Sequence, residues 1–197
     1  MKDNISEYLN TEEDYLIFKN IDNKIVSQDL ISMTKFLLIG PSGAGKSITL
    51  KKLLSDNSIE IYDLDCLLKE SLGVDSLSDY FKKFGNENFF NKSKEIIENL
   101  KGDKNILIAV GAGSIDFLGG HQWYKDQNTI VLIGNPDIIY SRSNRQRFHP
   151  TIDIYKLREF SIYRQNLYNN SKYIIDVTYL NPDEIAGKML ILIKNHC

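Results

Sequence analysis

The sequence is poor in several residue types whose abundance marks whole classes of protein. Its 197 residues include two cysteines, four prolines and one tryptophan. Two cysteines cannot form the dense disulfide framework of a small secreted domain, so Cys66 and Cys197 are interpreted as ordinary thiols in a reducing cytoplasm. Neither sign of charge is in excess, because 24 Lys plus Arg face 26 Asp plus Glu. This balance leaves no basic surface for a phosphate backbone, so we expect no nucleic-acid partner.

Long apolar runs are absent as well. The longest, at residues 106–110 and 189–193, contain five residues each, whereas a membrane-spanning helix needs about 20. The amino-terminal stretch MKDNISEYLNTEEDYL is acidic and lacks the apolar core of a secretory signal. We therefore expect a cytoplasmic protein with no membrane partner.

The chain does contain a regular alternation of two patterns. Short apolar runs, of the kind that form buried parallel strands, lie at residues 35–39, 59–62, 106–110, 129–133 and 173–177. Helical periodicity fills intervals between and after them, at residues 47–54, 89–100 and 182–193. This alternation predicts one α/β domain, a three-layer sandwich with a central parallel sheet. The last helix has a distinct start, with Asn181 as its predicted N-cap and Pro182 in its first turn.

The first apolar run leads directly into GPSGAGKS at residues 40–47, which satisfies the P-loop pattern GxxxxGKS. Glycines allow backbone N–H groups to turn towards a phosphate, and the helix that follows adds the positive end of its dipole. Lys46 would reach the β- and γ-phosphates, and Ser47 would offer a hydroxyl to Mg²⁺. Because a strand and a helix flank the motif, the sequence predicts a P-loop NTPase fold, similar to nucleoside monophosphate kinases, that binds ATP and Mg²⁺.

Two carboxylates, Asp63 and Asp65, follow the second apolar run. Residues two apart on an extended chain point to the same side, and ligands of an open α/β sheet bind at the carboxyl ends of its strands. Both acids are therefore expected to face the P-loop. One could bind or orient Mg²⁺ while the other takes the proton of an attacking hydroxyl. The alternative is a pair of solvated turn residues.

Two further features indicate contact with an anionic or closely bound ligand. The third apolar run is followed by Gly111, Ala112 and Gly113, where small residues permit close approach of a ligand, although a plain tight turn has the same composition. Arginines cluster between residues 142 and 164, and guanidinium groups bind phosphate and carboxylate in bidentate fashion. A solvated helix face is the alternative for this cluster. Its members are Arg142, Arg145, Arg147, Arg158 and Arg164.

The order of these motifs resembles that of shikimate kinases, small P-loop enzymes that phosphorylate a ring hydroxyl with ATP. The resemblance covers roughly residues 35–194 and includes the P-loop, the DxD of Asp63 and Asp65, and a GAG sequence at residues 111–113 that is similar to the family's GGG. It also includes RQNLY at residues 164–168, similar to the family's RxPLY.

This resemblance implies a division of the chain. Residues 35–197 would form the kinase domain, with an acceptor-binding insert at about residues 66–100 and a lid at about residues 142–158. Residues 1–34 would be an extension, in which two alternating stretches are consistent with a hairpin or an edge strand. The alternative is a flap that covers the edge of the sheet.

The resemblance also implies roles for individual residues. Lys46, Asp65 and Arg147 would be catalytic, with Asp65 as the base and Arg147, or Arg145 in its place, as the lid arginine. Ser47 and Asp63 would hold or orient Mg²⁺. The nucleotide would contact Gly43, Ala44, Gly45, Lys46, Ser47, Ile48, Arg142, Arg145 and Arg147, with Arg142 against adenine. The acceptor would contact Asp65, Phe90, Gly111, Ala112, Gly113 and Arg164.

Departures from the family pattern concentrate on the acceptor side. Phe90 stands where the family's GExxFR places an arginine, and Ala112 replaces the middle glycine of GGG. Hydrogen bonds to charged groups contribute roughly 1.5 to 3 kcal/mol each, so the loss of a bidentate pair would weaken carboxylate binding by more than about a hundredfold. We therefore predict ATP-dependent phosphorylation of a hydroxyl on shikimate or on a related cyclitol, polyol or hydroxy acid.

Two other functions remain as alternatives. A nucleotide-dependent switch would be consistent with the DxxG at residues 116–119, but both near matches to the guanine-reading NKxD motif lack its aspartate. A kinase-like binding module that has lost catalysis would be consistent with Phe90 and Ala112.

Overall fold

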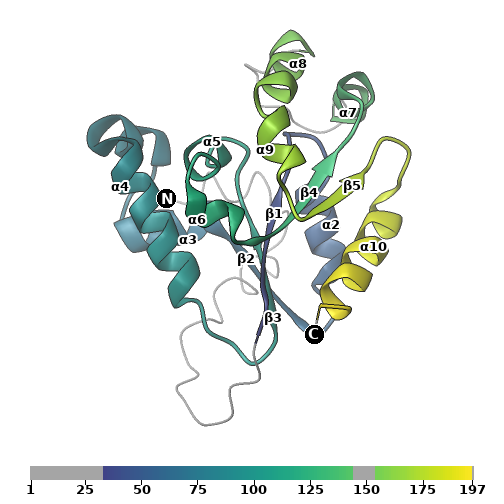
Figure 1. The fold of residues 1–197 in the computed structure, drawn as a ribbon, viewed down its shortest axis with the longest axis horizontal. Coiled ribbons are helices and arrows are strands. Elements are labelled where there is room, and N and C mark those ends of the chain that lie inside the picture. Colours follow the sequence, from purple (N-terminus) through teal and green to yellow (C-terminus); the bar gives the residue numbers. More distant parts are fainter. Residues whose placement is uncertain (1–32, 144–153, 197) are drawn as a thin grey trace. The chain divides into compact units, whose positions relative to one another are not determined.

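A computed structural model describes residues 33–143 and 154–196 of the chain. Its centre is a five-stranded parallel sheet with strand order β2-β3-β1-β4-β5 (Figure 1). The strands are β1 (Lys35–Ile39), β2 (Ile59–Asp63), β3 (Asn105–Ala109), β4 (Asn128–Ile133) and β5 (Tyr173–Asp176). Because the strands run in one direction, the segments that follow β1, β2 and β3 leave the sheet at the same edge, where ligands of such sheets bind.

The central strand contributes to two separate cores. Phe36 and Leu38 of β1 belong to one apolar cluster, and Leu37 and Ile39 belong to the other. Successive residues of a strand point to opposite faces, and all four side chains are at most 1% exposed. A strand covered on both faces has to be apolar throughout, which explains the uninterrupted apolar run in the sequence.

One face of the sheet is covered by α2 (Lys46–Leu53) and α10 (Pro182–Lys194), which pack together (Figure 1). The start of α10 is a capping box. The Asn181 side chain accepts bonds from the N–H groups of Asp183 and Glu184, and the Glu184 carboxylate accepts one from the Asn181 N–H. These hydrogen bonds satisfy N–H groups that the start of a helix leaves without a partner. The predicted N-cap is therefore confirmed.

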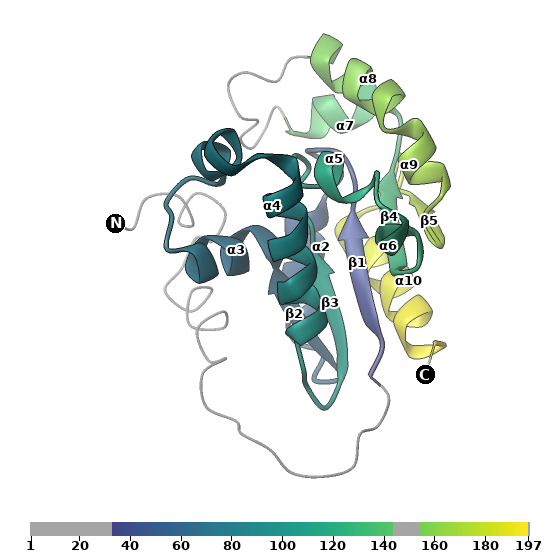
Figure 2. The same ribbon diagram turned by 60° about the vertical axis from the view of Figure 1, so that its left-hand side comes forward.

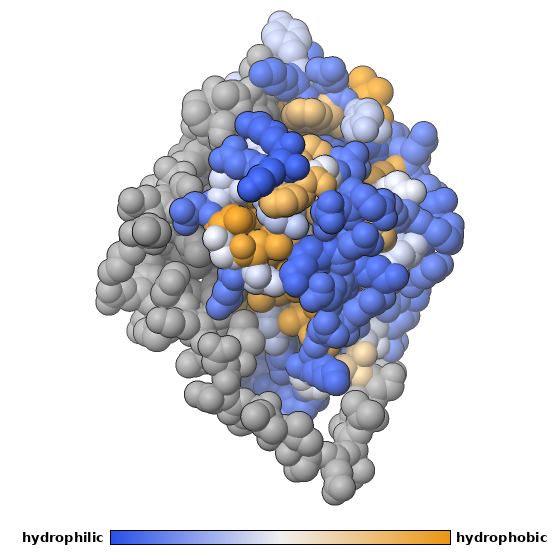
Figure 3. Space-filling model, turned by 90° about the vertical axis from the view of Figure 1, so that its left-hand side faces the viewer, coloured by the Kyte–Doolittle hydropathy of each residue, from blue (hydrophilic) through white to orange (hydrophobic). Residues whose placement is uncertain are grey.

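The opposite face is covered by a second set of helices, of which α3 and α4 are the largest (Figure 2). The set comprises α3 (Leu64–Leu72), α4 (Leu77–Asn99), α5 (Ile115–Leu118), α6 (Gln122–Lys125) and α9 (Gln165–Asn169). Helix α4 is kinked at Gly85, whose φ of 76° favours a residue without a side chain. Viewed from the side of α4, the described surface is mostly hydrophilic, with a few hydrophobic side chains between polar ones (Figure 3).

Two helices flank residues 144–153, α7 (Pro136–Ser143) before them and α8 (Ile154–Tyr163) after them. They contact each other and bury Ile139 and Leu157 in the same core as α2 and α10. Across the described ranges, no helix is long and apolar enough to cross a membrane.

The predicted α/β sandwich with a central parallel sheet is confirmed, and each predicted strand lies within one residue of its expected bounds. The helix predicted over residues 89–100 begins earlier, at Leu77, because the Ser76 hydroxyl caps the Asp79 N–H and starts a first segment before the Gly85 kink. The hairpin predicted within residues 1–34 falls almost wholly outside the described residues.

Candidate active site

The P-loop connects the end of β1 to the start of α2 at Lys46. Three of its glycines have positive φ angles, 147° at Gly40, 82° at Gly43 and 96° at Gly45. A side chain at Gly40 would also bring its Cβ to 2.5 Å from the Leu132 carbonyl oxygen. The loop can therefore fold back over the sheet edge only because glycine occupies these positions.

The Lys46 amine turns back onto this loop. Its Nζ donates to the carbonyl oxygens of Gly40 at 2.6 Å and Pro41 at 3.1 Å. Burial, together with the positive charge of Arg164, lowers the pKa of Lys46 to about 8, while Asp65 and Asp63 oppose the shift. The amine thus lies in a site that disfavours its charge until a further anion arrives.

The next positions present polar and apolar groups at the start of α2. Ser47 is exposed in the first turn, Ile48 is 44% exposed, and Thr49 is buried. Among the described residues, no group of three or more His, Cys, Asp or Glu side chains could hold a metal ion. The exposed hydroxyl of Ser47 suits Mg²⁺, which is usually held by one or two protein groups together with substrate phosphates and water.

Asp63 is the last residue of β2 and the N-cap of α3, its Oδ1 accepting a bond of 3.1 Å from the Cys66 N–H. The expectation that the chain stays extended through Asp65 is therefore wrong. Capping by Asp63 starts the helix at Leu64, so Asp65 lies in the first helical turn. The two acids nevertheless remain close enough to Lys46 for both to raise its pKa.

The Asp65 carboxylate contacts the turn that follows β3. Its Oδ1 accepts a bond of 2.6 Å from the Ser114 hydroxyl. Gly111 lies so close that a side chain there would collide with the same carboxylate. Burial raises the pKa of Asp65, and the negative charge of Asp63 adds to this effect, while the Ser114 bond and the charges of Lys69 and Lys46 oppose it. A carboxylate with a raised pKa is suited to accept a proton.

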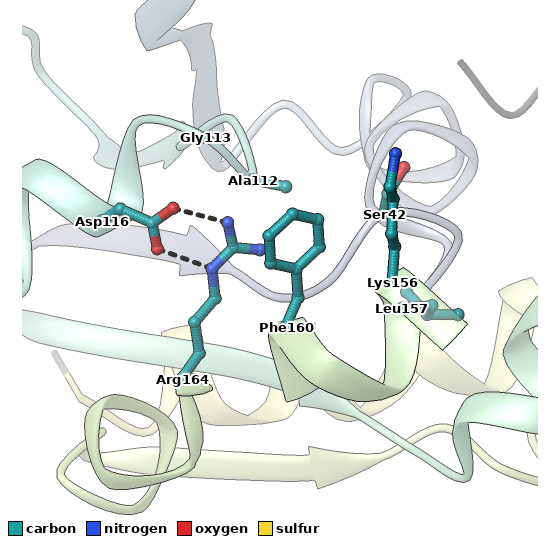
Figure 4. A pocket seen from close by; sticks show the side chains of 8 residues that line it. All are labelled: Ser42, Ala112, Gly113, Asp116, Lys156, Leu157, Phe160 and Arg164. Atoms are coloured by element: carbon teal, nitrogen blue, oxygen red, sulfur yellow. Dashed lines mark hydrogen bonds and ion pairs between the residues drawn. The ribbon is translucent and has the colours of Figure 1, made fainter. Parts of the chain in front are cut away.

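A cavity of about 400 Å³ opens beside this turn (Figure 4). At one end, the Arg164 guanidinium forms a two-point ion pair with Asp116, Nε to Oδ1 and Nη2 to Oδ2, each at 2.7 Å. The Phe160 ring lies 4.8 Å from the same guanidinium carbon, in cation–π contact. We call this space the Arg164 cavity; it is lined by Ser42, Ala112, Gly113, Asp116, Lys156, Leu157, Phe160 and Arg164.

Phe90 is not among the residues that line the Arg164 cavity. Its side chain is 6% exposed and stacks on His121, with the two ring centroids 3.4 Å apart and an angle of 6° between the planes. The Trp123 ring meets it edge-on at 6.0 Å. The ring that replaces the expected arginine thus belongs to the core between α4 and α6.

The predicted lid arginines, Arg145 and Arg147, lie outside the described residues. Arg142 lies near the end of α7, and its guanidinium donates to the carbonyl oxygens of Val177 at 2.7 Å and Thr178 at 2.5 Å. This arginine therefore ties α7 to the segment after β5, on the same sheet edge as the P-loop.

Sequence reasoning missed several residues around the cavity, above all Ser114 and Asp116. Asp116 entered only as part of a possible DxxG motif, yet it pairs with an arginine 48 positions later. Phe160 and Lys156 carry no motif of their own. The one signal available in the sequence was the acidic residue Asp116, which closely follows the GAG sequence at residues 111–113.

The parallel sheet, the glycine-built P-loop and the lysine at its end define a P-loop nucleotide-binding protein. Residues 42–194 match the family model described as shikimate kinase. Since this match spans most of the chain, the protein belongs to the shikimate kinase family. It is an ATP-dependent small-molecule kinase, a phosphotransferase that acts on a hydroxyl group.

Individual relatives agree with this assignment. The chain is 24% identical over 163 residues to a shikimate kinase of Thermodesulfovibrio yellowstonii, covering 80% of this chain and 94% of that protein. It is 29% identical over 175 residues to a shikimate kinase of Blochmanniella floridana, covering 82% and 94%.

Solved structures of shikimate kinases share the fold. The enzyme of Bacteroides thetaiotaomicron superposes with a TM-score of 0.65 at 18% identity, covering 83% of this chain and 99% of that one. The enzyme of Acinetobacter baumannii in complex with shikimate gives a TM-score of 0.57 at 23% identity, covering 84% and 95%.

Proposed function

We propose that this kinase transfers the γ-phosphoryl group of ATP to a hydroxyl of shikimate or of a related cyclitol, polyol or hydroxy acid. The observation that carries the proposal is the juxtaposition of Lys46 and Asp65. Each group shifts the pKa of the other, so a phosphate-binding cation and a proton acceptor would share one partly buried site. Transfer to a hydroxyl needs both, one for the phosphate charge and one for the proton.

The phosphate side of the site is assigned to the P-loop. The backbone N–H groups around Gly43, Ala44 and Gly45 would cradle the phosphates, with the amine of Lys46 leaving its carbonyl partners to reach them. Ile48 and Arg142 would contact the rest of the nucleotide. Mg²⁺, when held by Ser47 and oriented by Asp63, would neutralise part of the phosphate charge.

The proton acceptor is assigned to Asp65. Its position is held by the Ser114 hydroxyl, and burial makes its carboxylate more basic than a surface aspartate. A fixed, basic carboxylate can take the hydroxyl proton as the phosphoryl group arrives, since catalysis in this reaction class depends on positioning and charge.

The acceptor is assigned to the cavity beside Gly111, Ala112 and Gly113, with Arg164 at its far end. Phe90 would act only through the packing behind it. Residues 35–197 would be the kinase domain, with the insert at about 66–100 and the lid at about 142–158. A lid arginine, Arg147 or Arg145, would close over the transferred group and help to exclude water.

The test is Asp65→Asn in a coupled assay for ADP release with a panel of hydroxylated acids, cyclitols and polyols. We expect acceptor-dependent ADP release by the natural protein and a loss of about 10²- to 10⁴-fold in kcat for the variant, because the amide cannot take a proton. Nucleotide binding, followed by titration calorimetry, should persist in the variant.

Asp103→Asn, at an exposed position before β3, is the matched control and should keep full activity. Near-normal turnover by Asp65→Asn would remove Asp65 from the mechanism. Slow hydrolysis of ATP that ignores every acceptor would favour the switch, and no ADP release at all would favour the binding module without catalysis.

A further inference from the structure

We infer that Asp116 is a positioning residue for the reaction, which holds the Arg164 guanidinium by one edge so that its remaining N–H groups face the acceptor. The inference rests on the proposed function, in which Arg164 contacts the acceptor, and deepens it by naming the residue that orients this contact. It follows from the geometry of the Asp116–Arg164 pair and from the segment on which Asp116 lies.

The ion pair uses only part of the guanidinium. Nε donates to Oδ1 of Asp116 and Nη2 to Oδ2, each at 2.7 Å. A guanidinium has five N–H groups, so this pair leaves two on Nη1 and one on Nη2 for other partners. In Figure 4 the guanidinium nitrogen that does not bond to Asp116 points away from it, on the side of Phe160. The Arg164 side chain is 5% exposed and lines the Arg164 cavity, so a ligand in that space can reach this nitrogen.

The other surroundings of Arg164 leave the direction of its N–H groups open. The residue lies between α8 and α9, as the N-cap of α9, on a long side chain with many rotamers. Its contact with the Phe160 ring favours a cation over the ring without selecting which N–H group points where. Its charge also lowers the pKa of Lys46, which means that the two cations repel each other. A two-point ion pair fixes both the place and the direction of a guanidinium, and Asp116 supplies it.

Asp116 lies on the segment that also holds the proposed base. Its N–H donates to the Gly113 carbonyl oxygen at 3.2 Å. Ser114, two residues earlier, donates its hydroxyl to Asp65 at 2.6 Å. One short piece of backbone therefore sets the place of Asp65 relative to Arg164. Phosphoryl transfer to a hydroxyl depends on such positioning of the acceptor against the base.

The test is Asp116→Asn in the assay for ADP release, with shikimate, quinate and myo-inositol as probes and the compound of highest kcat/KM used throughout. The uncharged amide can accept only one of the two bonds from Arg164. We expect the KM for the acceptor to rise by about tenfold or more, the equivalent of one charge-assisted hydrogen bond. The KM for ATP should change by less than about twofold, whereas a general weakening of the structure would raise both KM values.

A double-mutant cycle shows whether Asp116 acts through Arg164. In an Arg164→Ala background, Asp116→Asn should cause no further loss of kcat/KM for the acceptor, because the group that it positions is absent. Asp137→Asn is the matched control. Asp137 also pairs with an arginine, Arg158 at 2.6 Å, but both side chains are about half exposed and lie outside the cavity. Its two KM values should equal those of the natural protein.

Each outcome decides for or against the inference. An unchanged or lower KM for the acceptor in a folded Asp116→Asn protein would overturn it and leave the proposed function intact. Equal losses in the natural and Arg164→Ala backgrounds would also overturn it, because Asp116 would then act on another group. If Arg164→Ala is inactive or unfolded, the difference between the changes in the two KM values decides alone.

Folding of the variants is judged by circular dichroism. Asp116→Ser, which also removes the carboxylate, replaces Asp116→Asn if the latter does not fold. If neither variant folds, Asp116 serves the fold rather than the site, and the inference is overturned. Absence of ADP release by the natural protein with every acceptor would overturn the proposed function itself, and the inference with it.

Discussion

The two halves of the site are built in different ways. The phosphate half is made mainly of backbone from one continuous loop, in which glycines supply φ angles that other residues rarely adopt. The proposed acceptor half is made of side chains that come from α5, α8 and the turns beside β3 and α9. A site built from backbone tolerates little variation, whereas a site built from side chains can change its ligand by single substitutions. Three measurements test this difference.

The largest effect is expected from the phosphate half. Lys46→Ala removes the cation that reaches the β- and γ-phosphates, so kcat/KM for ATP should fall by at least about a thousandfold with every acceptor in the panel. Coupled ADP release measures the loss, with Lys51→Ala on the same helix as the control. If the loss depended on the acceptor, the phosphate half and the acceptor half would not act independently.

A smaller effect is expected where the halves meet. Gly111→Ala places a Cβ against the Asp65 carboxylate, so the base should shift and kcat should fall by roughly a hundredfold, while ATP affinity stays the same. Gly120→Ala is the matched control because no atom lies within 4 Å of the added Cβ. Full activity of Gly111→Ala would show that Asp65 need not occupy its present position.

The smallest effect concerns proton uptake. The pKa of Lys46 is lowered to about 8, and phosphate binding favours the charged amine. ATP affinity should therefore be constant below about pH 7 and decrease by up to about tenfold per pH unit as the pH rises through about 8, with uptake of a proton on binding. Calorimetry in two buffers of different ionisation enthalpy measures this uptake. No uptake near pH 9 would place the Lys46 pKa well above 8.

The contrast also explains what the sequence could reveal. The P-loop, its flanking strand and its helix are contiguous, so spacing alone predicts them. The acceptor half depends on contacts between distant residues, such as Asp116 with Arg164 over 48 positions and Asp65 with Ser114 over 49. No periodicity in a single sequence marks such pairs, and so the residue that neutralises Arg164 was not recognised.

More of the fold than of the site could be predicted from the sequence, because the signals for strands and helix starts are local. Strands covered on both faces must be apolar at every position, and a helix start such as Asn181 to Glu184 carries its own hydrogen-bonding residues. The error at Asp65 arose because one side chain, Asp63, converts the end of a strand into the first turn of a helix. The helix segment before Gly85 was missed although Leu77, Tyr80, Phe81 and Phe84 repeat with the helical period.

The place of β1 in the sheet has a consequence for biosynthesis. Lys35 pairs with Ile106 and Phe36 with Asn128, so the strand that carries the P-loop has no partner nearby in the sequence. Both neighbours exist only after Ile133 of the 197 residues has been made. A ribosome-bound chain therefore carries β1 without β3 until Ala109 has been made and without β4 until Ile133 has been made. Slow, long-range pairing should leave that apolar strand dependent on chaperones until β4 emerges.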